Sequence, residues 1–259
     1  MTTFGKKFPA MFDTLLNHRT IRKYTNDPIP DQILQYILEA GTRASTTGNM
    51  QVYSIIVTTD KPIKEQLAPC HFNQPMVKMA PVVLTFCADF NRFSKWCRLR
   101  KADPGFDNFL SFMTAAIDAL LVAQNVCVAA EDAGLGICYL GTTTYMAGKI
   151  IEILELPRGV VPVTTVTLGY PGEHPGLTDR LPLEAVVHRE KYGDYSEEDI
   201  DHYYREKELV KSYQDFVKEN NKETLAQVFT DVRYKKVDNI LFSNSLLDIL
   251  REQDFMNHQ

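Results

Sequence analysis

The chain has 259 residues, of which 44% are hydrophobic and 24% charged, as is typical of a globular protein with a sizeable core. Its net charge of −5 argues against nucleic acid or an anionic membrane as the main partner. The 5 cysteines form no CxxC pair, so neither a disulfide framework nor a zinc site is expected. The N-terminal stretch MTTFGKKFPAMF has no apolar run typical of a secretory signal, which favours a cytoplasmic protein.

The first part of the chain alternates between short helical patterns and loops. An amphipathic segment at 10–18 leads into the basic stretch HRTIRK, and a helix is expected at 30–40, between the start signal of Pro30 and Asp31 and an end at Gly41. The polar loop ASTTGNMQ follows it. Four apolar segments rich in β-branched residues predict strands, at 52–59, 81–88, 135–140 and 160–168, with a short helix at 146–156.

The longest predicted helix, at 109–133, contains no Gly or Pro and is apolar on all sides. Such a helix has to be buried on all sides, or it spans a membrane. Asp118, Gln124 and Asn125 lie inside it, and an ionised Asp in mid-bilayer would cost about 2.5–3.5 kcal/mol. We therefore expect the central helix of a soluble protein, with a second subunit as part of its cover.

Helices and strands are mixed along the chain without regular alternation, which favours an α+β fold over a doubly wound sheet. The composition changes after Pro171, where a segment rich in turn-forming residues begins. Beyond Tyr192 the chain is rich in charged residues and has few apolar ones. We expect two regions, residues 1–192 and a helical C-terminal extension at 193–259.

Two polar segments are candidates for a ligand site. Arg19, Thr20 and Arg22 offer two forked cations and a hydroxyl, a set suited to a phosphate, although a solvated basic face is the plainer interpretation. The second segment, STTGNMQ, offers hydroxyls, amides and backbone N–H groups for a polar heterocycle, or is simply a loop.

Other common site patterns are absent from the sequence. The GxG at Gly134 follows a helix and opens a strand, whereas a dinucleotide fingerprint does the reverse, so Gly134 is better explained as a helix C-cap. The histidines show no metal-ligand spacing, Cys70-His71 included, and no nucleophile has an evident base. If the protein is an enzyme, we expect a bound cofactor to carry its chemistry.

Five stretches in their order resemble the nitroreductase family of FMN-dependent oxidoreductases: HRTIRKYTNDPIP, ASTTGNMQ, VLTFCADFNR, AQNVCVAAEDAGLGICYLG and VTLGYPGEHPGLTDRLP. Within it, the chain most resembles the branch of oxygen-insensitive NADPH nitroreductases and NADPH–flavin oxidoreductases. The resemblance implies an α+β homodimer with a central mixed or antiparallel sheet, packed by helices around the long helix. Residues 1–192 would then be the FMN-binding domain, and the extension would pack on it or on the partner subunit.

The resemblance also implies the site, with one FMN in each of two sites at the subunit interface. The residues that it assigns to the phosphate and ribityl end are His18, Arg19, Thr20, Arg22 and Arg180. Those assigned to the ring or ribityl are Ser45, Thr46, Thr47 and Gln74. Those that would cover one flavin face are Tyr139, Leu140, Gly141 and Thr142.

The activity implied is hydride transfer from NADPH or NADH, through flavin N5, to an electron-poor small molecule such as a nitroaromatic, a quinone or a flavin. Two alternatives remain: a flavin-binding sensor or carrier without turnover, and a structural dimer with an empty pocket. The sequence departs from the family pattern at three places. Thr178 stands where a lysine is usual, the glycine pair after the third strand is reduced to Gly141-Thr142, and no basic loop for the NADPH 2′-phosphate is recognisable.

Overall fold

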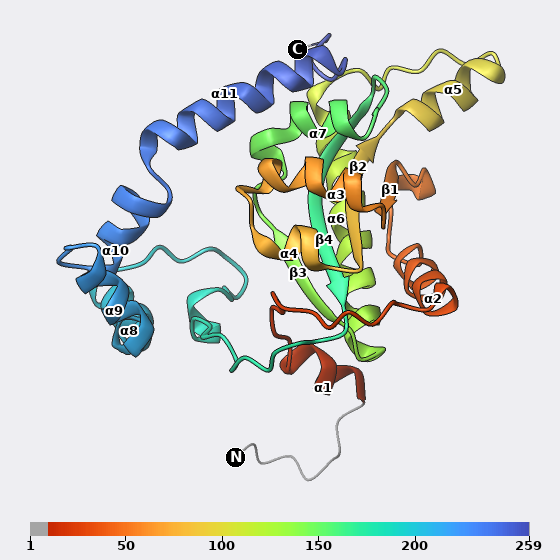
Figure 1. Ribbon diagram of the computed structural model, residues 1–259. Helices are drawn as coiled ribbons and strands as arrows, with labels where there is room; N and C mark the ends of the chain where they lie inside the picture. The colour runs from red at the N-terminus through yellow and green to blue at the C-terminus, as the bar shows by residue number, and fades with distance from the viewer. Residues whose placement is uncertain (1–9, 259) are drawn as a thin grey trace. The chain divides into compact units, whose positions relative to one another are not determined.

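The computed structural model describes residues 10–258, which form two compact units (Figure 1). The first unit comprises the described chain up to Gly176 together with the segment from Phe242 onward, and the second comprises Leu177–Leu241. These units do not share the boundary of the functional domains predicted at 1–192 and 193–259. That division stays a prediction, because compactness alone does not define a functional domain.

Four antiparallel strands form the sheet, in the spatial order β1-β2-β4-β3. Their bounds are β1 Tyr53–Thr58, β2 Val82–Asp89, β3 Gly136–Leu140 and β4 Val160–Gly169. The four predicted strands and the α+β fold are confirmed, and β1 and β3 are the edge strands.

Helices cover both faces of the sheet in the first unit. Their bounds are α1 Ala10–Leu16, α2 Asp31–Gly41, α3 Lys61–Leu67, α4 Pro75–Met79, α5 Asn91–Leu99, α6 Phe109–Asp132 and α7 Ala147–Ile153. Short turns of 3-10 helix are η1 Thr47–Asn49, η2 Ala68–His71 and η3 Thr144–Met146.

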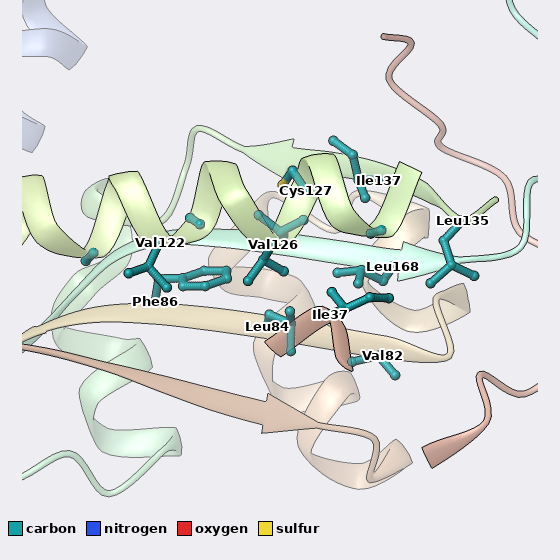
Figure 2. Close-up of a cluster of buried hydrophobic side chains, with 14 of the residues drawn as sticks. Ile37, Val82, Leu84, Phe86, Val122, Val126, Cys127, Leu135, Ile137 and Leu168 are labelled. Carbon is teal, nitrogen blue, oxygen red and sulfur yellow. The ribbon is translucent and has the colours of Figure 1, made fainter. Parts of the chain in front are cut away.

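The central strand β2 is buried on both faces, which explains its uninterrupted apolar sequence. Leu84 and Phe86 lie in the layer of α6, where they pack in one cluster with Val126 (Figure 2). Val83 points to the opposite layer, because side chains alternate along a strand. There it packs with residues of α3, α4 and α7, namely Leu67, Val77 and Ile150.

The central helix α6 has a defined signal at each end. It starts at Asn108, whose side chain accepts a hydrogen bond from the N–H of Ser111 (3.0 Å). It ends in a Schellman motif, in which Gly134 has a φ of 80° and the N–H of Leu135 donates to the carbonyl of Ala130 (2.9 Å). The interpretation of Gly134 as a helix terminus is thereby confirmed.

The two sides of α6 have different surroundings. One side packs on the sheet, and Ala119, Val122, Ala123 and Val126 are fully buried there. The other side carries large apolar residues that are 40 to 75% exposed, namely Leu110, Met113, Ile117, Leu120 and Leu121. The described residues of one chain therefore do not provide the expected cover on every side.

Among the described residues, α6 is the one helix long and apolar enough to cross a membrane. Half of that stretch is buried inside the protein itself. Its Asp118 is also buried, where its carboxylate accepts hydrogen bonds from two backbone N–H groups. These contacts fit the core helix of a soluble protein.

The second unit is helical. Its elements are η4 Leu183–Ala185, α8 Glu197–Leu209, α9 Lys211–Glu219, α10 Leu225–Val228 and the π-helical turn η5 Phe229–Arg233. The last helix, α11 Lys236–Glu252, contributes residues to both units. Within the second unit Lys207 pairs with Asp179 (2.8 Å) and Lys222 with Asp231 (2.8 Å).

Candidate flavin site

The segment that carries the predicted phosphate residues runs beside the edge strand β3. Thr20 forms a parallel bridge with Ile137, and the N–H of Ile21 donates to the carbonyl of Ile137 (2.9 Å). The backbones approach so closely that a Cβ on Gly136 would come within 2.6 Å of the Ile21 side chain. Gly136 is therefore required for this contact, which fixes the register of the basic segment on β3.

An open cleft of about 500 Å³ lies at this end of β3. Its lining combines the polar side chains of Arg19, Glu131 and His174 with the buried residues Ile21, Leu135 and Gly136. A guanidinium beside glycine and apolar residues suits a ligand with a charged end. Of the predicted phosphate residues, Arg19 lines the cleft.

The electrostatics of the cleft are mixed. His18 Nδ1 lies 2.8 Å from Glu131 Oε1, which fixes the imidazole and leaves its Nε2 for another partner. The backbone N–H groups of Arg22 and Lys23 both donate to Glu173 Oε1 (2.7 and 3.1 Å). The sequence interpretation missed both carboxylates, although Glu173 lies inside the stretch YPGEHPG that carries the resemblance.

The predicted flavin-covering residues lie at the other end of β3. Ile137 offers its carbonyl to the outer edge, so by the alternation of a strand the backbone groups of Tyr139 also face outward. Beyond Leu140 the loop turns at Gly141, where an added Cβ would meet no atom of the described chain within 4 Å. The chain itself does not require glycine there, and the space is available to a bound planar group.

His71 contacts one of the predicted site residues, a contact that the sequence did not reveal. It is fully buried, and its Nδ1 lies 2.8 Å from the hydroxyl of Thr142. Burial lowers its pKa to about 4, so its imidazole is neutral at pH 7. Gln74 follows at the start of α4, and its N–H donates to the carbonyl of His71 (3.1 Å). The structure therefore brings Gln74 and Thr142 together through His71.

The loop with Ser45, Thr46 and Thr47 is anchored elsewhere in the same chain. The N–H of Thr47 donates to Asp118 Oδ1 (2.9 Å), whereas His18 is held by Glu131. These two anchors on α6 are roughly 20 Å apart along the helix axis and roughly 140° apart around it. One chain thus presents the two predicted parts of the flavin site in different directions.

Arg180 belongs to the second unit, where its guanidinium donates to the carbonyl of Asp179 (2.9 Å). Its contribution to the phosphate end stays a prediction, as do the roles of the other predicted site residues. Arg22 is exposed, and its side chain does not line the cleft.

Comparisons with known proteins show the family to which the chain belongs. The model of the nitroreductase family matches residues 15–170, more than half of the chain. An FMN reductase (NADPH) of Bacillus subtilis is 33% identical over 207 residues, which cover 75% of this chain and 83% of that protein. An NADPH-flavin oxidoreductase of Vibrio harveyi is 36% identical over 191 residues, covering 74% of this chain and 78% of that protein.

Among solved structures, that of a Bacteroides fragilis protein superposes with a TM-score of 0.94 at 57% identity, and covers 95% of this chain and 100% of that one. The chain therefore belongs to the nitroreductase family. The resemblance inferred from five sequence stretches is confirmed.

Proposed function

We propose that the protein is an FMN-dependent oxidoreductase that transfers a hydride from NADPH or NADH to an electron-poor small molecule. Family membership and relatives named as NADPH-dependent flavin reductases support this activity. The observation that carries it in this chain is the β3 edge, with a guanidinium at one end and open space at Gly141 at the other. That donor set fits a cofactor with a phosphate and a planar ring.

When bound, FMN supplies the redox chemistry, since it accepts a hydride at N5 and passes it on. The residues of this chain bind and orient it. Arg19 and His18 would hold the phosphate end, and the outward backbone of Tyr139 with the loop at 141–142 would cover the ring. A nitroaromatic, a quinone or a free flavin would enter the same cleft after the oxidised nicotinamide leaves, which gives ping-pong kinetics.

We further propose a homodimer with two flavin sites, each built from both subunits. The exposed apolar stripe of α6 supports a second copy as its cover, because such a stripe on a soluble protein marks an interaction surface. The separate anchoring of the 18–22 and 45–47 segments also supports it. The second copy would bring its own 45–47 loop to the β3 edge of the first.

A cytoplasmic location is part of the same proposal. All five cysteines lie in the described residues and are buried with free thiols, as expected in a reducing compartment. The net charge of −5 gives no reason to expect nucleic acid or a membrane as a partner.

The direct test is a purified protein titrated with NADPH or NADH without oxygen. A yellow protein that bleaches, and recovers on addition of a quinone or nitroaromatic, supports the enzyme. A yellow protein that neither reductant bleaches is a flavin-binding sensor or carrier. A colourless protein that does not take up added FMN contradicts flavin binding altogether.

A further inference from the structure

The loop after β3 carries a threonine, Thr142, in place of the second glycine that the family pattern leads one to expect there. This threonine contacts a histidine that is fully buried in η2, His71. We propose that His71 and Thr142 form a positioning pair that holds the Thr142 hydroxyl as a hydrogen-bond donor toward the flavin. The inference rests on the proposed function, because it names a further determinant of the same site.

The surroundings of His71 determine which of its ring nitrogens carries the proton. Its Nε2 is buried and has no hydrogen-bond partner among the residues that the structure describes. If Nε2 carried the proton, the chain would hold a buried N–H without an acceptor, which is a rare defect in folded proteins. With the proton on Nδ1, the imidazole donates to Thr142 Oγ1 across 2.8 Å. The geometry therefore favours the Nδ1–H tautomer.

The Thr142 hydroxyl has a proton of its own to donate. A hydroxyl that accepts from His71 keeps its own O–H for another acceptor. The neighbouring Thr143 differs, because its hydroxyl donates within the protein, to the carbonyl of Leu140 (3.0 Å). Thr142 is only partly buried, whereas Thr143 is 1% exposed. Thr142 therefore offers a hydroxyl that is both held by the protein and available to a ligand.

Hydrogen bonds within the chain hold the turn that carries Thr142. The N–H of Tyr145 donates to the carbonyl of Thr142 (3.1 Å), and the Thr143 hydroxyl also lies 3.0 Å from the hydroxyl of Thr165 in β4. These bonds hold the backbone on both sides of Thr142. His71 fixes the remaining freedom, the direction in which the hydroxyl points, so a ligand meets a donor that is already oriented.

The chemistry of the ligand follows from this arrangement. A fixed O–H donor beside the open space at Gly141 recognises a hydrogen-bond acceptor on a planar ring. The isoalloxazine of FMN carries such carbonyl oxygens and ring nitrogens. His71 acts through Thr142 and does not touch the flavin, since its free nitrogen is buried.

The test combines nitrogen NMR of His71 in the flavin-free protein with FMN titrations of folded variants. We expect the Nδ1–H tautomer, and about fivefold weaker FMN binding for both Thr142→Val and His71→Phe, the size of one net hydrogen bond. The double variant is expected to lose no more than either single variant. Thr142→Ser keeps the hydroxyl and His71→Asn keeps a donor near Nδ1, so both are expected to retain most of the affinity.

An Nε2–H tautomer, unchanged FMN affinity of Thr142→Val, or additive losses in the double variant would overturn the pair. A His71→Asn variant that binds FMN as weakly as His71→Phe would assign His71 a purely structural role and also overturn it. The proposed function fails separately, if the wild-type protein binds no FMN. The tautomer measurement remains valid in that case, because it needs no flavin.

Discussion

The two segments predicted to bind the flavin, at 18–22 and 45–47, differ in how the fold presents them. The first is tied to the β3 edge and to Glu131 near the end of α6, whereas the second is tied to Asp118 in its middle. Both are well anchored, yet they face roughly opposite sides of one helix. Under the proposed function, a single chain therefore supplies two halves of different sites, and a second copy packed on its exposed apolar stripe would complete them.

The largest expected effect comes from separating the subunits. Ile117→Asp places a carboxylate in the exposed stripe of α6, where burial of an unpaired charge costs about 3–5 kcal/mol and weakens dimer formation at least about 100-fold. We expect a folded monomer by light scattering, with FMN binding lost. Met79→Asp is the matched control, since Met79 is also half-exposed and lies in α4, on the other side of the sheet.

A flavin-loaded Ile117→Asp dimer would show that the stripe is not the interface. Ala123 is not suited to this experiment, because it is fully buried against the sheet of its own chain. A charge there would unfold the chain and would not isolate the dimer contact.

The next largest effect is a pH dependence of the protein's stability. It arises from His71 in the β3 half of the site, by which we mean the part of the site that lies beside strand β3. Burial lowers the pKa of His71 to about 4, so between pH 6.5 and 4 the unfolded chain binds a proton that the folded chain excludes. Stability is therefore full above about pH 6.5 and falls by about 3 kcal/mol as the pH drops to 4. Urea unfolding of the wild type and of His71→Phe measures it. Identical pH dependence of the two proteins would contradict the burial of a neutral imidazole.

Removal of a cation tests the phosphate end of the same half. The resemblance assigns Arg22 to the phosphate, although its side chain does not line the cleft of the single chain. On that assignment, Arg22→Ala is expected to weaken FMN binding by about 1.5–3 kcal/mol, which is roughly 10- to 150-fold, because a charge-assisted contact is lost. Lys23→Ala is the control, because it removes a neighbouring cation that is not assigned to the phosphate. Equal affinity of the two variants in a flavin titration would remove Arg22 from the site and leave Arg19 as the main cation there.

The smallest effect concerns the preference between the two reductants, because the 2′-phosphate of NADPH is expected to meet residues outside both halves. The family's basic loop is expected near residues 219–222, where the cations are lysines, namely Lys211, Lys218 and Lys222. Lys222 is already paired with Asp231 at 2.8 Å. Lysine also lacks the forked geometry of arginine. We therefore expect kcat/KM for NADH to be within about tenfold of that for NADPH. A hundredfold preference for NADPH at one fixed acceptor concentration would show that Lys218 and Lys222 nevertheless bind the phosphate.

Many features of the fold could be predicted from local sequence patterns. The four strands, the extent of α6 and the terminating role of Gly134 depend on periodicity and on glycine at a positive φ, which short stretches specify. The order of the family stretches identified the candidate site residues. What the sequence did not reveal depends on contacts distant in the chain, such as His71 beside Thr142 or Thr47 on Asp118. The return of the C-terminal residues to the first unit is likewise set by tertiary packing.

A complementation experiment tests most directly whether each flavin site is shared between two subunits. One variant, Arg19→Ala/Arg22→Ala, impairs the β3 half, and another, Thr46→Glu, impairs the loop half, so each alone is expected to bind FMN poorly. In a dimer that contains one chain of each, the intact β3 half meets the intact loop of the other chain. We predict that mixing and refolding the two restores one FMN per mixed dimer. Recovery of no flavin, although mixed dimers form, would contradict a site shared between subunits.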